Sequence, residues 1–223
     1  MSHEALMRIP LFPLGSTLFP QGKLALKIFE VRYLDMIKTA YRDKTPFGVV
    51  TLEQGGEVRV PGSEDIEFSE IGTLAHIKDI DAIQPSLLMI LCEGGQRFKV
   101  HQRERLKNGL WMADVELIQD DPQVAVPNEL IKAADTFDKL ARSFDQQGVE
   151  IDRLPFNYPL RLNECGWVAN RWAELLQINQ NLEKEIDKRT LSLKDALLKA
   201  QNADKAKSTF LGNMSHEIRT PLN

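Results

Sequence analysis

Apolar and polar residues alternate through the first half of the chain and recur at helical spacing through the second half. Alternation with a period of two, or a short β-branched and apolar run, predicts a strand. Segments of this kind occupy residues 8–15, 24–28, 47–52, 71–83, 87–93, 97–106 and 110–118. Apolar positions at helical spacing predict one short amphipathic helix over residues 30–41. Because Pro10 and Pro13 lack an N–H, the first segment is expected to be an edge strand or merely extended.

Turn residues separate these predicted strands. Residues 54–69 are polar and contain glycines and a proline, which predicts a hairpin or exposed loop. Pro85–Ser86 and Gly94–Gly95 predict further turns, and Asn108–Gly109 is a strong two-residue hairpin signal. Short strands at regular spacing with such turns are typical of a barrel or a sandwich.

The second half of the folded body reads as helical. After a linker with two prolines at residues 120–127, apolar residues follow helical spacing from Leu130 to Phe144, and Gly148 ends that run. A second helical pattern covers residues 162–178 and includes Trp167 and Trp172. A β-rich half followed by a helical half predicts an α+β fold.

A different pattern begins at residue 179. Between Asn179 and Phe210 the chain has no proline or glycine, and its charges alternate in sign. Apolar residues separated by four, seven, four and three positions fit the seam of a coiled coil: Leu182, Ile186, Leu193, Leu197 and Ala200. A lone helix of this kind is marginal in water. We therefore expect one long helix that forms a parallel homodimer, although a single solvated helix remains open.

Composition narrows the classes of function. The chain has 28 Lys and Arg against 32 Asp and Glu, a net charge of −4, so no basic excess favours nucleic acid. No apolar run approaches the ~20 residues that a membrane span needs, and the first residues do not resemble a signal peptide. Cys92 and Cys165 share no ligand spacing, and reduced thiols fit a cytoplasmic protein. Since His3, His76 and His101 lack metal-ligand spacing, we expect no metal site.

The last nineteen residues, KAKSTFLGNMSHEIRTPLN, place His216 between a serine and Glu217. On a helical wheel Leu211, Met214 and Ile218 fall within about 60° of one another. His216 lies about 165° from their centre, so a helix here would point the imidazole to solvent. An ordinary surface histidine remains an alternative at this point.

The run AKSTFLGNMSHEIRTPLN resembles the phosphoacceptor H-box of two-component sensor histidine kinases. This resemblance implies that His216 accepts phosphate, that Glu217 acts as base or orienter, and that residues 219–221 complete the motif. The preceding residues, EIDKRTLSLKDALLKAQNADKAKS, are similar to the signalling helix of such kinases. The implied partners are a response regulator and a kinase catalytic domain. ATP and Mg²⁺ would come with that catalytic domain, since no nucleotide-binding motif follows here and no bound cofactor is expected.

Residues 7–178 resemble a second family. The segments IPLFPLGSTLFPQGKLALKIFEVRY, GTLAHI, GGQRFKV and CGWVANRWAELL are similar to the N-terminal domain of Lon proteases. That resemblance implies a PUA-like β pseudo-barrel followed by a helical bundle, which recognises unfolded or tagged polypeptide. The chain has no GxxxxGK[ST] motif, so neither ATPase nor protease activity is expected. RNA binding by a PUA-like domain is disfavoured by the acidic balance.

Four regions are therefore expected. Residues 1–120 form a β-rich subdomain, 121–178 a helical subdomain, 179–204 a coiled-coil signalling helix, and 205–223 a phosphoacceptor segment. The leading hypothesis is a phosphorelay protein in which a polypeptide-binding domain is joined to His216. The alternative is a non-enzymatic polypeptide-binding module with an inert kinase-derived tail. Whether the chain belongs to an enzyme stays open at this stage.

Overall fold

The computed structural model describes residues 6–54, 66–84, 86–150, 154, 156–183, 186, 189–192 and 194. The chain divides into two compact units, Met1–Gln177 and Ile178–Asn223. The predicted phosphoacceptor segment, with His216 and Glu217, lies outside the described residues.

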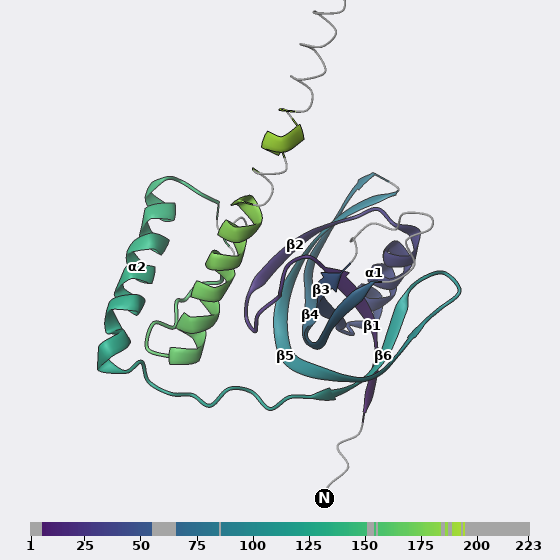
Figure 1. Ribbon diagram of the computed structural model, residues 1–223, viewed down its shortest axis with the longest axis horizontal. Helices are drawn as coiled ribbons and strands as arrows, with labels where there is room; N and C mark the ends of the chain where they lie inside the picture. Colours follow the sequence, from purple (N-terminus) through teal and green to yellow (C-terminus); the bar gives the residue numbers. More distant parts are fainter. Residues whose placement is uncertain are drawn as a thin grey trace, which may run out of the picture. The chain divides into compact units, whose positions relative to one another are not determined.

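The first part of unit one is a closed β-barrel with an added strand (Figure 1). Its elements are β1 (Met7–Leu14), β2 (Lys23–Ile28), α1 (Val31–Asp43), β3 (Phe47–Gln54), β4 (Glu67–Gln84), β5 (Leu87–Arg105) and β6 (Trp111–Leu117). The strand order is β2-β5-β4-β3-β1-β6, and pairing of β6 with β5 closes the ring. Closure leaves β2 outside the barrel, and it decides between the barrel and the sandwich that the strand pattern allowed.

Strand β1 lies inside the sheet, so its prediction as an edge strand is wrong. It pairs with β6 over residues 7–11 and with β3, in parallel, over residues 11–14. Pro10 and Pro13 therefore each lie in a half of the strand that has only one neighbour. A missing N–H can then point to the side without a partner, which is why the strand accepts two prolines.

Strand β5 is longer than the sequence predicted. Gly94 and Gly95 do not form a turn; they lie within one continuous strand that pairs first with β2 and then with β6. A hairpin at Asn108–Gly109 is confirmed, with Gly109 at φ 85°, but it is not a two-residue turn. Arg105 is the last residue paired with Trp111, so residues 106–110 form a five-residue loop. A pair of glycines predicts a turn from sequence alone. Here Gly94 and Gly95 instead lie where β5 stops pairing with β2 and continues toward its pairing with β6.

Helix α1 begins after Glu30 and ends at Asp43, because the next residue, Lys44, has a left-handed backbone (φ 53°). Its apolar face, with Tyr33, Leu34 and Ile37, packs on the inward side chains of the strands. Full burial of one such side chain contributes about 1.5–3 kcal/mol. The predicted helix over residues 30–41 is confirmed with its end two residues later.

The helical part of unit one has a core of its own. It contains a short 3₁₀ turn η1 (Asn128–Leu130), α2 (Ile131–Gln146) and a helix that starts at residue 165. Phe137 is fully buried at its centre and meets the rings of Phe156, Trp167 and Trp172 edge-on, with centroids 5.2–5.9 Å away. The two helices lie side by side in Figure 1, and the indole N–H of Trp172 donates to the carbonyl of Ala133.

In unit two, residues 178–183, 186, 189–192 and 194 are helical. Leu182 and Ile186, two members of the predicted seam, are more than half exposed in this single chain. Exposed apolar side chains at these positions are what a coiled-coil monomer would present, but the pairing itself stays a prediction. Leu193, Leu197 and Ala200 lie outside the described residues. Within the described chain no helix has both the length and the apolar character needed to cross a bilayer.

Candidate functional site

A loop between β1 and β2 joins the barrel to the helical part. Its turn at Phe19–Gly22 is fixed by a hydrogen bond from the N–H of Gly22 to the carbonyl of Phe19. The N–H of Gln21 donates to Gly94 on β5, and Gly94 donates in return to Gly22. An ideal Cβ on Gly94 would lie 2.1 Å from the carbonyl oxygen of Phe19, so only glycine lets the turn come this close.

The helix that starts at residue 165 holds the other side of this loop. The Arg171 guanidinium donates to the carbonyl of Pro20 at 2.9 Å. One turn and two turns further along, Glu174 lies against Gly22 and Gln177 exchanges two hydrogen bonds with Thr17. Positions three residues apart share one face of a helix, so Arg171, Glu174 and Gln177 form a stripe that fixes the loop.

Arg171 and Glu174 form a buried ion pair at 2.8 Å, with side chains 0% and 9% exposed. Burial raises the pKa of Glu174 to about 8, although the nearby guanidinium opposes that shift. Burial also lowers the pKa of Arg171. One carboxylate oxygen and two guanidinium nitrogens have no hydrogen-bond partner among the described residues. Burial of the pair between the barrel and the helical part is thus the cause of the raised pKa of this carboxyl.

Beside this contact the surface is hollowed into a groove that both parts of unit one line. One hollow, of about 300 Å³, is lined by Gln21, Gly95 and Arg97 from the barrel side and by Trp167 and Asn170 from the helix. A second, of about 220 Å³, includes Thr17, Thr51 and Thr73. The two hollows share Pro20, Arg97 and Asn170, so we treat them as one feature, the junction groove.

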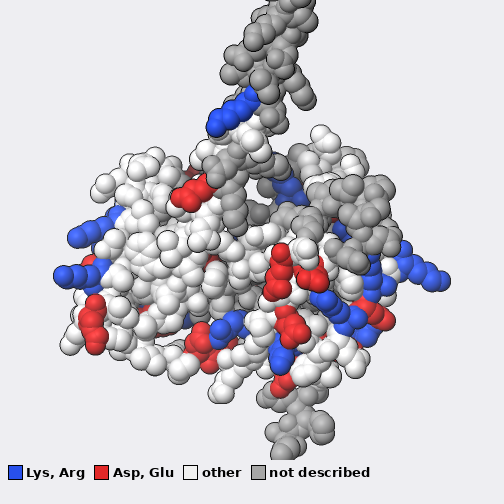
Figure 2. Space-filling model, in the orientation of Figure 1, with Lys and Arg blue, Asp and Glu red and all other residues white. Residues whose placement is uncertain are grey.

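The chemistry of the junction groove is mixed. Four carboxamides line it: Gln21, Gln96, Gln123 and Asn170. Each carboxamide can both donate and accept a hydrogen bond, as a peptide group does. Four of its five charged side chains form two ion pairs, Arg97 with Asp121 at 2.5 Å and Arg161 with Glu164 at 3.6 Å, and the fifth is Asp120. Figure 2 likewise shows acidic and basic side chains interspersed on the visible face, without an extended field of one sign.

The residues that the sequence singled out have different outcomes. His76 and His101 are exposed on strands as expected, and His101 pairs with Glu116 at 2.6 Å. Trp167 packs in the helical core but also lines the groove. In the described part of the chain no three His, Cys, Asp or Glu side chains are placed to hold a metal ion. His216 and Glu217 lie outside the described residues, so their predicted roles stay predictions.

Sequence reasoning missed two features. Arg103 of β5 is exposed, and its guanidinium lies over Phe68 at 4.3 Å and near Trp111 at 5.7 Å. The Arg171–Glu174 pair was not singled out either. Its only signal is an Arg and a Glu at i and i+3 in an otherwise apolar helical run, which also describes many exposed pairs.

Comparison with known proteins assigns the first unit. The ATP-dependent protease La (LON) substrate-binding domain family matches residues 8–208. This chain belongs to that family. The Lon N-terminal domain protein from Xanthomonas campestris superposes with a TM-score of 0.56 at 26% identity, over 76% of this chain and 82% of that one. The Lon-type domain, as we now call residues 8–177, thus has the family's fold as expected.

Two curated relatives match different parts of the chain. Lon protease from Anaeromyxobacter dehalogenans is 27% identical over 150 residues, 67% of this chain and 15% of the protease. Sensor histidine kinase AruS from Pseudomonas aeruginosa is 57% identical over 42 residues, 19% of this chain and 4% of the kinase. The chain thus spans a small fraction of either relative. The kinase match is short, and it indicates a kinase-related segment without carrying the activity of a whole kinase.

Proposed function

We propose that the Lon-type domain binds unfolded polypeptide in the junction groove and that this binding is coupled to phosphoryl acceptance at His216. The observation that carries the first half is the groove itself, in a domain whose family is named for substrate binding. Carboxamides suit the alternating donors and acceptors of a peptide backbone, and Trp167 with Pro20 supplies flat apolar surface for side chains. Paired charges favour a ligand of mixed composition over a polyanion.

The groove can be blocked with little disturbance at Gly166. A Cβ there would meet nothing closer than the Cβ of Asp121 at 3.8 Å, so a larger side chain can extend into the groove. Gly166→Phe should weaken binding of a labelled, permanently unfolded polypeptide at least tenfold in fluorescence anisotropy. Gly166→Ala is the matched control and should change affinity less than twofold. Equal affinity for all three proteins would place the polypeptide elsewhere.

The second half of the proposal is supported by the H-box resemblance and by the short kinase match. His216 would attack the γ-phosphorus of ATP held by a separate catalytic domain, and phosphoryl transfer there depends on positioning and on charge neutralisation by Mg²⁺. A neutral imidazole is needed, and Glu217 would orient it by accepting a hydrogen bond from its other ring nitrogen. A response regulator would then receive the phosphoryl group.

A parallel homodimer through the seam of Leu182, Ile186, Leu193, Leu197 and Ala200 would hold two phosphoacceptor segments together. Sedimentation equilibrium should show a dimer whose dissociation constant rises at least tenfold when Leu193→Asp and Leu197→Asp are combined. A monomeric parent chain would rule the pairing out.

The alternative function is polypeptide binding alone, with residues 178–223 inert. The same anisotropy assay separates the two proposals when it is run on the full chain and on residues 1–177. It must be paired with measurement of phosphoryl transfer to His216. Unchanged transfer on addition of unfolded polypeptide, together with normal binding, would favour the module without signalling.

A further inference from the structure

Three strand segments form a small sheet that continues from one side of the barrel. They are β2, residues 76–84 of β4 and residues 87–93 of β5, and we call them the flap. The inward side chains of the flap, including Ile28, Leu88 and Ile90, belong to the barrel core. Because side chains alternate along a strand, their neighbours point to the other face.

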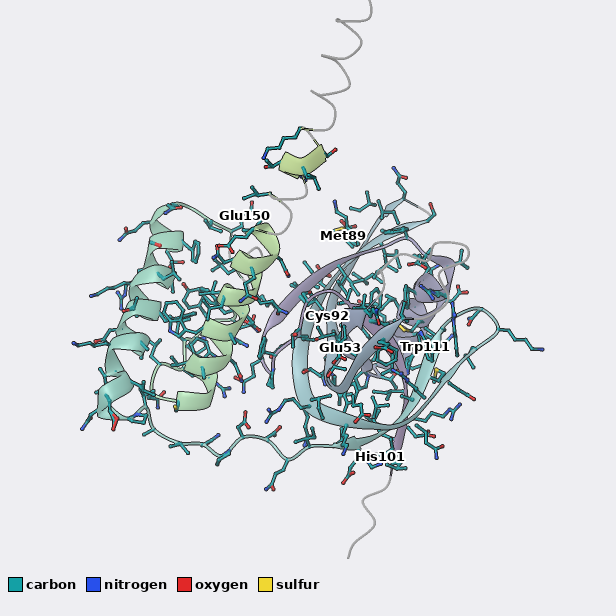
Figure 3. The ribbon with its side chains drawn as sticks, viewed as in Figure 1. Glu53, Met89, Cys92, His101, Trp111 and Glu150 are labelled. Atoms are coloured by element: carbon teal, nitrogen blue, oxygen red, sulfur yellow. The ribbon has the colours of Figure 1, made fainter. Side chains whose placement is uncertain are left out.

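That outer face has an apolar centre. Leu87, Met89 and Leu91 on β5 alternate with core residues and are only partly buried. Figure 3 shows Met89 on the hairpin of β4 and β5, with Cys92 further along β5. Phe29 and Ile83, which border the same end of the flap, are 53% and 52% exposed. Contiguous exposed apolar surface on a protein usually marks an interaction site.

A positive side chain flanks this apolar centre on the β2 side, and negative side chains flank it on the β4 side. The strand register sets Lys27 of β2 opposite Met89, and Asp81 of β4 opposite Met89 on the other side. The next row runs from Ala25 through Leu91 to Asp79. With neighbouring strands about 4.8 Å apart, the backbones of Lys27 and Asp81 lie roughly 10 Å from each other, on either side of Met89. Among the described residues neither side chain has an ion-pair partner.

We propose that the outer face of the flap binds the flap of a second copy of this chain. A two-fold axis parallel to β5, between the two faces, places β2 of each copy over β4 of the other. Lys27 of each copy then forms an ion pair with Asp81 of the other copy, which gives two symmetry-related pairs. Met89 and Leu91 pack against Met89 and Leu91 of the second copy. Such an isologous contact requires a self-complementary surface, and this charge arrangement supplies one.

The fixed positions of Lys27 and Asp81 favour a second copy over an unfolded chain. An unfolded polypeptide would gain from the apolar centre alone, whereas only a partner of defined charge pattern gains from both flanks. The inference does not depend on polypeptide binding in the junction groove, nor on phosphoryl transfer to His216.

A cross-linking experiment on the full chain tests the contact. Stacked sheets lie about 10 Å apart, so a bismaleimide of similar reach should join two Met89→Cys chains when Cys165→Ser removes the accessible native thiol. Lys139→Cys, on the exposed side of α2, is the matched control for joining by other routes. Yield at position 89 should exceed yield at position 139 at least tenfold.

Charge exchange then identifies the occupant. Lys27→Asp or Asp81→Lys alone sets like charges against each other and should lower the yield at least fivefold. The double variant restores opposite charges and should return the yield to within twofold of the parent. It also carries both substitutions, so its recovery shows that the single variants fold. Equal yields at positions 89 and 139, or no recovery in the double variant, would overturn the proposal. Competition by unfolded polypeptide without charge rescue would assign the face to that ligand instead.

Discussion

The Arg171 guanidinium lies 2.8 Å from the Glu174 carboxylate and donates at the same time to the carbonyl of Pro20. One buried pair on the helix thus fixes the loop that lines the junction groove. Desolvation is the larger influence on this carboxyl, because its pKa is raised despite the adjacent cation.

The first prediction concerns pH and stability. A carboxyl whose pKa rises from 4.5 to about 8 on folding binds a proton more tightly in the native state. Its contribution to stability is therefore complete below pH 4.5 and is lost as the pH rises toward 8. Since one pKa unit equals about 1.4 kcal/mol, the free energy of unfolding should fall by a few kcal/mol across that window.

Glu174→Gln removes this titration. The variant should be about as stable as the parent at low pH, because the amide resembles the protonated carboxyl, and its decline between pH 4.5 and 8 should be smaller than in the parent. Urea unfolding at intervals of half a pH unit measures both slopes. Parallel curves for parent and variant would mean that Glu174 keeps an ordinary pKa.

The second prediction concerns the loop contact at Gly94. Gly94→Ala puts a Cβ against a backbone carbonyl oxygen at 2.1 Å, and the backbone has to move. Overpacking of this kind costs about 1–3 kcal/mol. Gly166→Ala adds the same methyl group where the nearest atom is 3.8 Å away, so it should leave the free energy of unfolding unchanged or raise it slightly. Similar values for both variants would refute the close approach.

Local patterns in the sequence predicted individual helices and strands better than they predicted which strands pair with each other. The hairpin at Asn108–Gly109 was predictable because its loop, residues 106–110, is closed by hydrogen bonds between residues near in sequence. The position of β1 in the sheet depends on its pairing with β3 and β6, which are distant in sequence. Its two prolines therefore led to the wrong prediction of an edge strand. The junction groove was out of reach for the same reason, since Gln21, Arg97 and Asn170 meet only after closure of the barrel.

The third prediction concerns the helical core. Phe137 is fully buried among three aromatic rings that have edge-on contacts with it. Phe137→Ala should lower the free energy of unfolding by about 3–5 kcal/mol, from lost transfer energy and the cavity left behind. Phe137→Leu keeps most of the volume and should cost clearly less. Chemical denaturation monitored by tryptophan fluorescence compares them, and equal losses would argue against tight packing at this site.

The fourth prediction separates the two thiols. Burial raises the pKa of Cys92 to about 12, and its side chain is fully buried inside the barrel, whereas Cys165 is partly accessible. Thiolate is the reactive form. At pH 8 an aromatic disulfide reagent should therefore modify one thiol per native chain and two in denaturant. Cys165→Ser should abolish the native signal; rapid modification of that variant would show that Cys92 is accessible.

The central claim is that a polypeptide-binding Lon-type domain is joined to a working phosphoacceptor. Its most direct test incubates the full chain with an intact histidine-kinase catalytic domain, Mg²⁺ and γ-labelled ATP, with and without unfolded polypeptide. We predict acid-labile label on the parent chain, none on His216→Ala, and a transfer rate that changes when the polypeptide is added. No label on the parent, or label that persists in His216→Ala, would contradict the account.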